Sequence, residues 1–184
     1  MPPHVAQLSD EALVALVSRG DEAALDALYT RFGRVAYGLA LRIVRDADLA
    51  QDAVQEAFLS AWRTAATFDP SRGNASSWLL TLVHRRAVDV VRREQRRRAE
   101  PLDDAPVASG DAPDEDAWIR ERRRTVQAAL ARLSPDQRQA LELAYYGGLS
   151  QSELAERLGV PLGTVKSRMF AALARLRDVL GEEP

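Results

Sequence analysis

The segment LSQSELAERLGVPLGTVKSRMF, residues 149–170, constrains the fold of this chain more than any other feature. Ser150, with Glu153 three positions later, forms a capping-box pattern that marks the start of a helix. Gly159 suits the left-handed position beyond the end of that helix, and Pro161 suits the start of a second helix rather than the interior of the first. Two helices joined by a short turn that contains glycine predict a helix-turn-helix.

The residues near the start of the second helix have the chemistry of a DNA-reading surface. In a helix-turn-helix, these positions contact base edges in the major groove. Cations and hydroxyl groups there can bind phosphates and bases. The candidate DNA-contacting residues are Gln151, Pro161, Gly163, Thr164, Lys166, Ser167 and Arg168. The same pattern also fits an ordinary helical hairpin with a solvated basic face, so the rest of the chain has to decide.

Helical periodicity and capping residues recur through nearly all of the remaining sequence. The expected N-caps are Ser9 or Asp10, Asp21, Ser76 or Ser77, and Ser134, the last followed by Pro135 and Gln137. The pattern is broken at residues 99–113, which are rich in proline, aspartate and small residues and hold too few apolar side chains to offset the entropy of ordering. We therefore predict an all-α protein with two small helical domains, 1–98 and 114–184, joined by a flexible acidic linker at 99–113.

The net charge of −2 conceals two basic surfaces. Residues 1–60 contain nine acidic and five basic side chains, whereas residues 85–98 contain seven arginines and two acidic side chains. Residues 159–177 contain four basic side chains and no acidic one. Because local fields attract phosphates and the total charge mainly concerns solubility, the overall acidity is compatible with binding nucleic acid.

The polar loop SRGNASS at 71–77 and the arginine-rich helix after it have the character of a surface for an unpaired strand. Arg85, Asp89 and Arg92 fall on one helix face at spacings of four and three. Arginines hold phosphates, and amide and hydroxyl groups of a loop can read an exposed base. The alternative is a solvated helix that leads into the linker. Trp78 could stack on a base, but tryptophan is usually largely buried, so we expect it in the core.

A carboxylate stripe of Asp48, Asp52 and Glu56, which recur at every fourth residue, lies on a predicted helix beside Phe58 and Trp62. Carboxylates at this spacing can bind metal or perform acid–base chemistry, but no histidine lies nearby to complete such a site. An exposed helix face and a protein-docking surface are the other two interpretations. The spacing alone does not choose among them.

Several classes of function lack their sequence signatures. There is no cysteine, the two histidines lack zinc-ligand spacing, and no glycine-rich phosphate loop occurs. We therefore expect no catalysis, no metal and no cofactor. Neither a secretory signal nor an apolar run of about 18 residues is present, so we expect a soluble, cytoplasmic protein that does not insert into membranes.

Three sequence blocks, taken together, resemble one family. LYTRFGRVAYGLALRIVRDADLAQDAVQEAFLSAWR resembles the first conserved segment of bacterial sigma-70 factors, and FDPSRGNASSWLLTLVHRRAVDVVRRE resembles their promoter-melting and −10-reading segment. The block from Leu130 to Arg177, which contains the helix-turn-helix, is similar to their C-terminal domain. The order of the blocks and the acidic linker resemble the small extracytoplasmic-function (ECF) group, over almost the whole chain.

The resemblance implies a dissociable subunit that directs RNA polymerase core enzyme to promoter DNA and that an anti-sigma factor, often membrane-bound, holds inactive. It implies polymerase docking by Asp48, Asp52, Gln55, Glu56 and Phe58. It implies −10 binding by Arg72, Asn74, Ser76, Ser77, His84, Arg85, Arg86, Asp89, Arg92 and Arg93, and −35 reading by the helix-turn-helix residues named above. Many relatives carry asparagine within the −10-reading helix, where this chain has HRRAVD, so the roles of His84 to Asp89 stay open.

Two other functions fit parts of the sequence. An autonomous operator-binding regulator would explain the helix-turn-helix, but it predicts an α/β receiver domain, and the N-terminal half lacks β-rich apolar runs. A non-DNA adaptor would explain the acidic helix but neither of the basic surfaces. Binding to duplex promoter DNA without polymerase distinguishes an operator-binding regulator from an ECF sigma factor. The regulator should bind such DNA well, and the sigma factor should bind it weakly.

Overall fold

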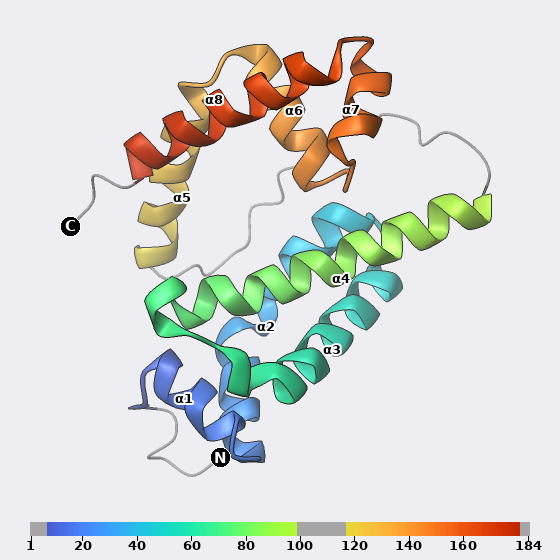
Figure 1. Ribbon diagram of the computed structural model, residues 1–184. Helices are drawn as coiled ribbons and strands as arrows, with labels where there is room; N and C mark the ends of the chain where they lie inside the picture. The colour runs from blue at the N-terminus through green and yellow to red at the C-terminus, as the bar shows by residue number, and fades with distance from the viewer. Residues whose placement is uncertain (1–6, 99–116, 181–184) are drawn as a thin grey trace. The chain divides into compact units, whose positions relative to one another are not determined.

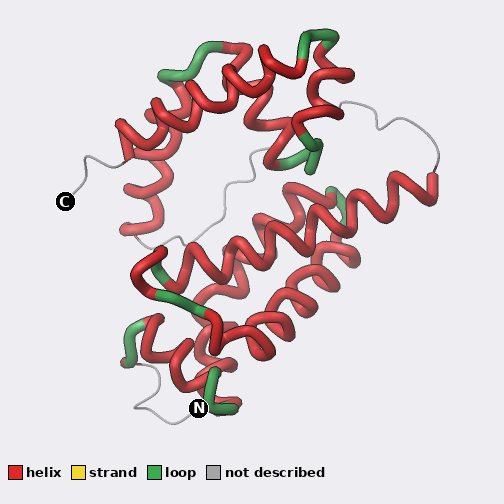
Figure 2. The backbone as a smooth tube through the Cα atoms, in the orientation of Figure 1, coloured by secondary structure: helices red, strands yellow, loops and turns green. Residues whose placement is uncertain are grey.

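A computed structural model describes residues 7–98 and 117–180, and all regular structure in these two ranges is helical (Figures 1 and 2). The predicted all-α fold is therefore confirmed. The chain divides into two compact units, unit 1 (Met1–Ala105) and unit 2 (Pro106–Pro184). The predicted linker at 99–113 lies outside the described residues.

The described part of unit 1 consists of α1 (Asp10–Val17), α2 (Glu22–Val44), α3 (Ala47–Thr64) and α4 (Ala75–Arg98), with the short 3-10 helices η2 (Ala65–Thr67) and η3 (Pro70–Arg72) between α3 and α4. Ser9, rather than Asp10, caps α1, and Asp21 caps α2 as predicted. Arg45 adopts a left-handed conformation with φ of 59°, and Asp46 directly after it caps α3. The connection between α2 and α3 is therefore very short, which places the two helices side by side.

The core of unit 1 is built largely from alanine and valine. Ala40 of α2, Ala53 of α3 and Val83 of α4 are all fully buried. Small side chains let helix backbones approach closely, and α3 packs against both α2 and α4. Trp78 is only partly buried and packs against Phe68, with ring centroids 5.5 Å apart.

The start of α4 differs from the sequence prediction. Neither Ser76 nor Ser77 is the cap; instead the Asn74 side-chain oxygen accepts a hydrogen bond from the Ser77 backbone N–H at 2.8 Å. Asparagine is as good a cap as serine, and choosing it starts the helix earlier in the chain. Ser76 and Ser77 therefore lie in the first turn of α4.

Unit 2 contains α5 (Ala117–Ala131), α6 (Pro135–Tyr145), α7 (Gln151–Leu158) and α8 (Leu162–Leu180). Both predicted capping boxes are present, with Ser134 before α6 and Ser150 before α7. Gly159 ends α7 with φ of 62°, the left-handed conformation expected there, and α8 begins directly after Pro161. The α7–turn–α8 segment is the predicted helix-turn-helix.

The core of unit 2 is small and is supplemented by polar contacts. Leu154 of α7 and Val165 and Ala172 of α8 are fully buried. Arg138 and Arg175 donate to backbone carbonyls at the end of α5, those of Leu130 and Arg132 at 3.0 and 3.4 Å. Such cationic donors satisfy carbonyl groups that a helix end leaves without partners.

Candidate nucleic-acid interface

The start of α8 presents a mixed polar and aromatic surface to solvent. Gly163, Lys166 and Ser167 are exposed, and the Ser167 hydroxyl donates to the Thr164 carbonyl at 2.9 Å. Phe170 is 77% exposed, and its spacing of three and four residues from Ser167 and Lys166 puts it on the same helix face. Of the other predicted residues, Gln151 and Pro161 are exposed and Thr164 is partly buried.

Phe170 was missed by the sequence analysis, although a signal for it existed. Among the exposed large hydrophobic side chains of the described residues, Phe170 has the greatest exposed fraction, and apolar contacts with the thymine methyl group are an established way to read DNA. Its spacing from Lys166 and Ser167 was visible in the sequence. We refer to Gly163, Lys166, Ser167 and Phe170 as the α8 face.

Arg168, also predicted to contact DNA, is engaged within the protein. Its guanidinium lies 2.7 Å from the Asp136 carboxylate in the first turn of α6, and its side chain is 27% exposed. Arg168 follows Ser167 by one residue, which turns it about 100° around the helix from that side chain. In this arrangement Arg168 joins α8 to α6.

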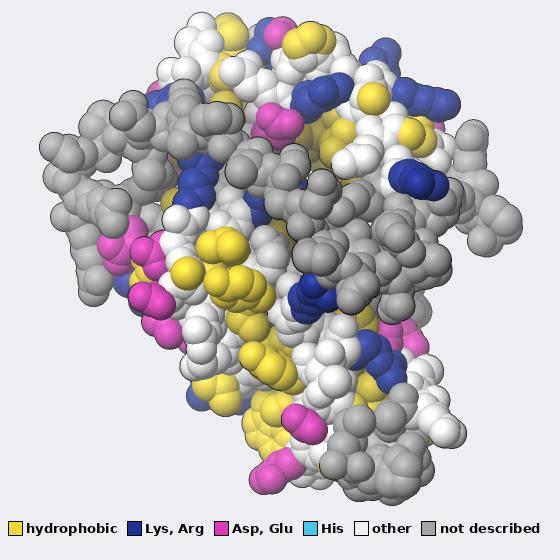
Figure 3. Space-filling model, turned by 180° about the vertical axis from the view of Figure 1, so that it is seen from behind, with side chains coloured by type: hydrophobic (Ala, Val, Ile, Leu, Met, Phe, Trp, Pro, Cys, Tyr) yellow, Lys and Arg dark blue, Asp and Glu magenta, His cyan; other side chains and the backbone are white. Residues whose placement is uncertain are grey.

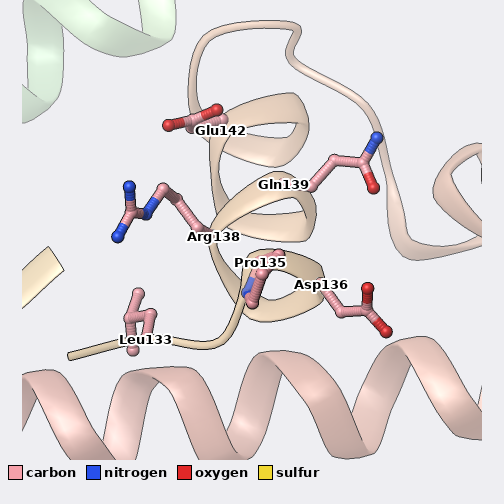
Figure 4. A pocket seen from close by; sticks show the side chains of 6 residues that line it. All are labelled: Leu133, Pro135, Asp136, Arg138, Gln139 and Glu142. Atoms are coloured by element: carbon pink, nitrogen blue, oxygen red, sulfur yellow. The ribbon is translucent and has the colours of Figure 1, made fainter. Parts of the chain in front are cut away.

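Asp136 also borders a shallow hollow of about 470 Å³ beside the start of α6, lined by Leu133, Pro135, Asp136, Arg138, Gln139 and Glu142. Figure 4 shows the Asp136 side chain reaching from the first turn of α6 toward the neighbouring helix, away from Arg138 and Glu142. Four of the six lining residues are polar or charged, and several of the lining side chains are exposed. The hollow is open to solvent, unlike the enclosed pockets that are typical of small-molecule sites.

The loop before α4 is held by a series of short-range hydrogen bonds. Asp69 accepts from both the backbone N–H and the hydroxyl of Ser71, at 3.0 and 2.7 Å, and these bonds lower the pKa of its carboxyl. Asn74 accepts from the Ser76 hydroxyl at 3.0 Å as well as from the Ser77 N–H. The Asn74 carbonyl oxygen is therefore committed to the helix cap, and contact with a base would fall to its amide donors.

The loop is also held by a residue far away in the sequence. The Glu11 carboxylate of α1 accepts a hydrogen bond from the Ala75 backbone N–H, the first residue of α4, at 3.2 Å. Backbone N–H groups of Glu11 itself and of Ala75 hold the pKa of the Glu11 carboxyl below its ordinary value. Asn74 and Glu11 thus hold the backbone at the start of α4. The side chains of Arg72, Asn74 and Ser77 remain exposed.

The face of α4 that follows the loop is basic and exposed. Arg85, Arg92 and Arg93 are exposed, whereas His84 and Arg86 are partly buried. Asp89, also exposed, lies 4.0 Å from the Arg86 guanidinium. An exposed row of arginines after a polar loop has the features of a site for the phosphates of an unpaired strand.

The carboxylate stripe of Asp48, Asp52 and Glu56 on α3 is exposed, and so is Gln55 beside it. Phe58 does not belong to this surface: it is 5% exposed and packs edge-to-face on Tyr29, with ring centroids 5.0 Å apart. Its spacing from the buried Val54 already pointed inward. The exposed apolar neighbour on α3 is instead Leu59, which is 52% exposed.

Hydrophobic side chains reach the surface of unit 1 elsewhere as well. Tyr37 and Leu41 on α2 are 36% and 37% exposed, and Figure 3 shows hydrophobic side chains gathered on one face of this unit with acidic side chains at its margins. Across residues 7–98 and 117–180, His, Asp and Glu side chains nowhere gather in threes in a way that could hold a metal ion. None of the helices in these ranges is both long and apolar enough to cross a membrane.

Two family models match the chain, one in each unit. The model described as sigma-70 region 2 matches residues 28–97, and the model described as sigma-70 region 4 matches residues 123–176. The first match contains the loop, α3 and the exposed arginines of α4, and the second contains the helix-turn-helix. Between them they place both candidate surfaces in sigma-70 regions.

Curated relatives narrow the assignment. The chain is 41% identical over 186 residues to the ECF RNA polymerase sigma factor SigK of Mycobacterium bovis, covering 97% of each chain. It is 42% identical over 173 residues to SigK of Mycobacterium ulcerans, covering 92% of each. The chain therefore belongs to the ECF RNA polymerase sigma factors. Among solved structures, SigE of Rhodobacter sphaeroides in complex with the anti-sigma ChrR is 31% identical, with a TM-score of 0.47, covering 92% of this chain and 97% of that one.

Proposed function

We propose that this chain binds RNA polymerase core enzyme in the cytoplasm and directs it to promoters by reading duplex −35 DNA and melted −10 DNA. The observation that carries the proposal is the exposed α8 face on a helix-turn-helix, in a chain that matches ECF sigma factors over nearly its whole length. Sigma factors are initiation factors and not enzymes, and the proposed function needs no cofactor or metal.

In unit 2, the −35 element would contact the α8 face, together with Thr164, Gln151 and Pro161 at its margin. Lys166 supplies a charge for phosphates or guanine, Ser167 supplies a hydroxyl, and Phe170 supplies an apolar surface for thymine. Because Asp136 already holds Arg168, we propose that Arg168 contributes to −35 binding by fixing α8 against α6.

In unit 1, an unpaired base of the −10 element would bind where the loop residues Arg72 and Asn74 meet the first turn of α4, which carries Ser76 and Ser77. The exposed arginines Arg85, Arg92 and Arg93 would hold the phosphates of the same strand. His84, Arg86 and Asp89 would flank that path, and the contact between Arg86 and Asp89 orders the Arg86 side chain.

Polymerase docking would use the exposed carboxylate stripe of Asp48, Asp52 and Glu56 together with Gln55, with Phe58 beneath it as packing support. A single reversal of charge tests this assignment. Asp52→Arg should abolish co-purification with core enzyme, because a cation would replace the central carboxylate of the stripe. Glu22→Arg, also an exposed residue in the same unit, is the matched control and should bind core normally. Normal binding by the Asp52 variant would remove the stripe from the docking surface.

An anti-sigma factor completes the proposal, because ECF sigma factors are held inactive by such partners. The exposed hydrophobic side chains of unit 1, among them Tyr37, Leu41 and Leu59, offer a surface on which such an inhibitor could compete with polymerase. Any membrane anchorage would then belong to that partner and not to this chain.

The deciding experiment adds the purified chain to core RNA polymerase and maps transcripts from the upstream region of its own gene and from random genomic fragments. Discrete starts that share two spaced motifs would establish the function and give the promoter consensus. Absence of binding to core, combined with tight binding of the chain alone to duplex promoter DNA, would instead support an operator-binding regulator.

A further inference from the structure

We infer that Glu11 of α1 is a positioning residue that sets the −10 loop for base capture. The inference rests on the proposed function of the loop and adds to it a residue that lies outside the sigma-70 region 2 match at 28–97. Glu11 would touch no base; it would act through the backbone of Ala75, the first residue of α4.

The position of Glu11 is determined from both sides. Within α1, Glu11 lies in the first turn of a helix whose start is capped by the Ser9 side chain. Across 64 residues of sequence, the Glu11 carboxylate accepts from the Ala75 N–H at 3.2 Å. The helix itself is tied to α2, because the Arg31 guanidinium forms an ion pair with Asp10 and donates to the Leu8 carbonyl at 3.2 Å. The carboxylate therefore reaches the loop from a fixed support.

The hydrogen bond between the Ala75 N–H and the Glu11 carboxylate lies at the start of α4, directly after the loop. The first N–H groups of a helix have no partners within that helix, and carry the positive end of its dipole. Asn74 satisfies the Ser77 N–H, and Glu11 satisfies the Ala75 N–H, so the two acceptors together fix the first turn of α4. Gly73, just before the cap, has a positive φ of 153°, a backbone conformation that favours glycine. Arg72, Asn74 and Ser77 take their directions from this backbone.

The loop and the base-reading side chains could fold without Glu11, because Ala75 is itself 1% exposed and packed in the core. The hydrogen bond from Ala75 to Glu11 would favour one loop conformation over closely related ones. Because Glu11 acts on the strand only through the backbone of the loop, we expect part of the free energy of this hydrogen bond to reach strand binding, about three- to tenfold in affinity.

The test uses holoenzyme assembled from core polymerase and the full chain, with wild type, Glu11→Gln and Glu11→Ala. Glu22→Gln and Glu22→Ala are matched controls, because Glu22 is an exposed glutamate in the first turn of the neighbouring α2. The probes are a single-stranded oligonucleotide with the −10 segment of a promoter at which the chain initiates, the same strand with each base changed, and a −35 duplex. Fluorescence anisotropy gives the affinities.

We expect Glu11→Ala to weaken binding of the −10 strand about three- to tenfold and to reduce discrimination against changed bases, with −35 binding and core binding unchanged. The affinity of Glu11→Gln for the −10 strand should lie between those of wild type and Glu11→Ala. The glutamine amide oxygen can still accept from the Ala75 N–H, but it lacks the charge that the helix dipole favours. Unchanged strand binding in the Ala variant, or an equal loss on the −35 duplex, would overturn the inference. Failure of wild-type holoenzyme to bind either probe would instead overturn the proposed function.

Discussion

The described part of unit 1 buries 23 hydrophobic side chains, whereas the described part of unit 2 buries six, namely Ala129, Leu133, Ala140, Leu154, Val165 and Ala172. Unit 2 compensates with polar contacts: capping boxes fix the starts of α6 and α7, and its helices are connected by arginines on the carbonyls at the end of α5 and by the pair of Arg168 with Asp136. The difference indicates that the shape of unit 1 follows from packing, whereas that of unit 2 depends more on individual polar residues.

The largest effect should come from removing one side chain of the small core. Leu154→Ala deletes a fully buried side chain and should destabilise unit 2 by about 2–5 kcal/mol. Because few other buried side chains stabilise unit 2, we expect α7 and α8 to lose hydrogen-exchange protection. Leu79→Ala, an equivalent deletion in unit 1, should leave α2 and α3 measurably protected. Hydrogen exchange with mass spectrometry resolves the two units, and equal loss of protection in both would remove the proposed difference.

A cap should matter less than a core residue but more than a surface pair. Ser150→Ala removes the acceptor of the Glu153 N–H and the partner in the capping box, and should cost about 1 kcal/mol of stability in unit 2. Ser152→Ala on the same exposed helix turn is the control and should cost little. Thermal unfolding followed by circular dichroism measures both, and equal melting temperatures for the two variants would argue against a structural role for the box.

The parts of this fold that the sequence predicted depend on residues close together in the chain. Ser134 with Gln137, Ser150 with Glu153, and the turn at Gly159 each act over three or four residues, so local chemistry determines them. The exposed stripe around Asp52 also follows from periodicity alone. The misplaced cap of α4 shows the limit of such rules, because Asn74, Ser76 and Ser77 are all competent caps and the rules do not rank them.

What the sequence could not predict are contacts between helices that are distant in the chain. Nothing near Glu11 shows that it reaches Ala75, and nothing near Arg168 shows that Asp136 holds it. Such contacts depend on the packing angle of whole helices. The sequence shows that Arg168 is a cation that can bind an acceptor. It does not show that the Asp136 carboxylate within the protein is such an acceptor, in addition to any phosphate of DNA.

The pair of Arg168 and Asp136 tests whether a partly exposed polar contact positions the α8 face. Arg168→Ala and Asp136→Ala should each reduce stability by only about 0.2–1 kcal/mol, because the carboxylate is 60% exposed. If the pair acts as a unit, the double variant should lose no more −35 affinity than either single variant. Additive losses in holoenzyme binding to a −35 duplex would mean that Arg168 contacts DNA independently of Asp136.

The smallest effect concerns the charge of Glu11 and is measured through pH. Backbone N–H groups of Glu11 and Ala75 lower the pKa of this carboxyl from its ordinary value of 4.5, so the folded state binds a proton less readily than the unfolded chain. Its stabilising contribution is therefore complete above pH 4.5 and is lost as the pH falls through the lower pKa of the folded state. The difference in unfolding free energy between wild type and Glu11→Gln should be largest near neutral pH and shrink in acid. Asp69, whose pKa is also lowered, is present in both proteins and cancels from this difference. A difference that stays constant from neutral to acid pH would show that Glu11 stabilises unit 1 by its shape and not by its charge.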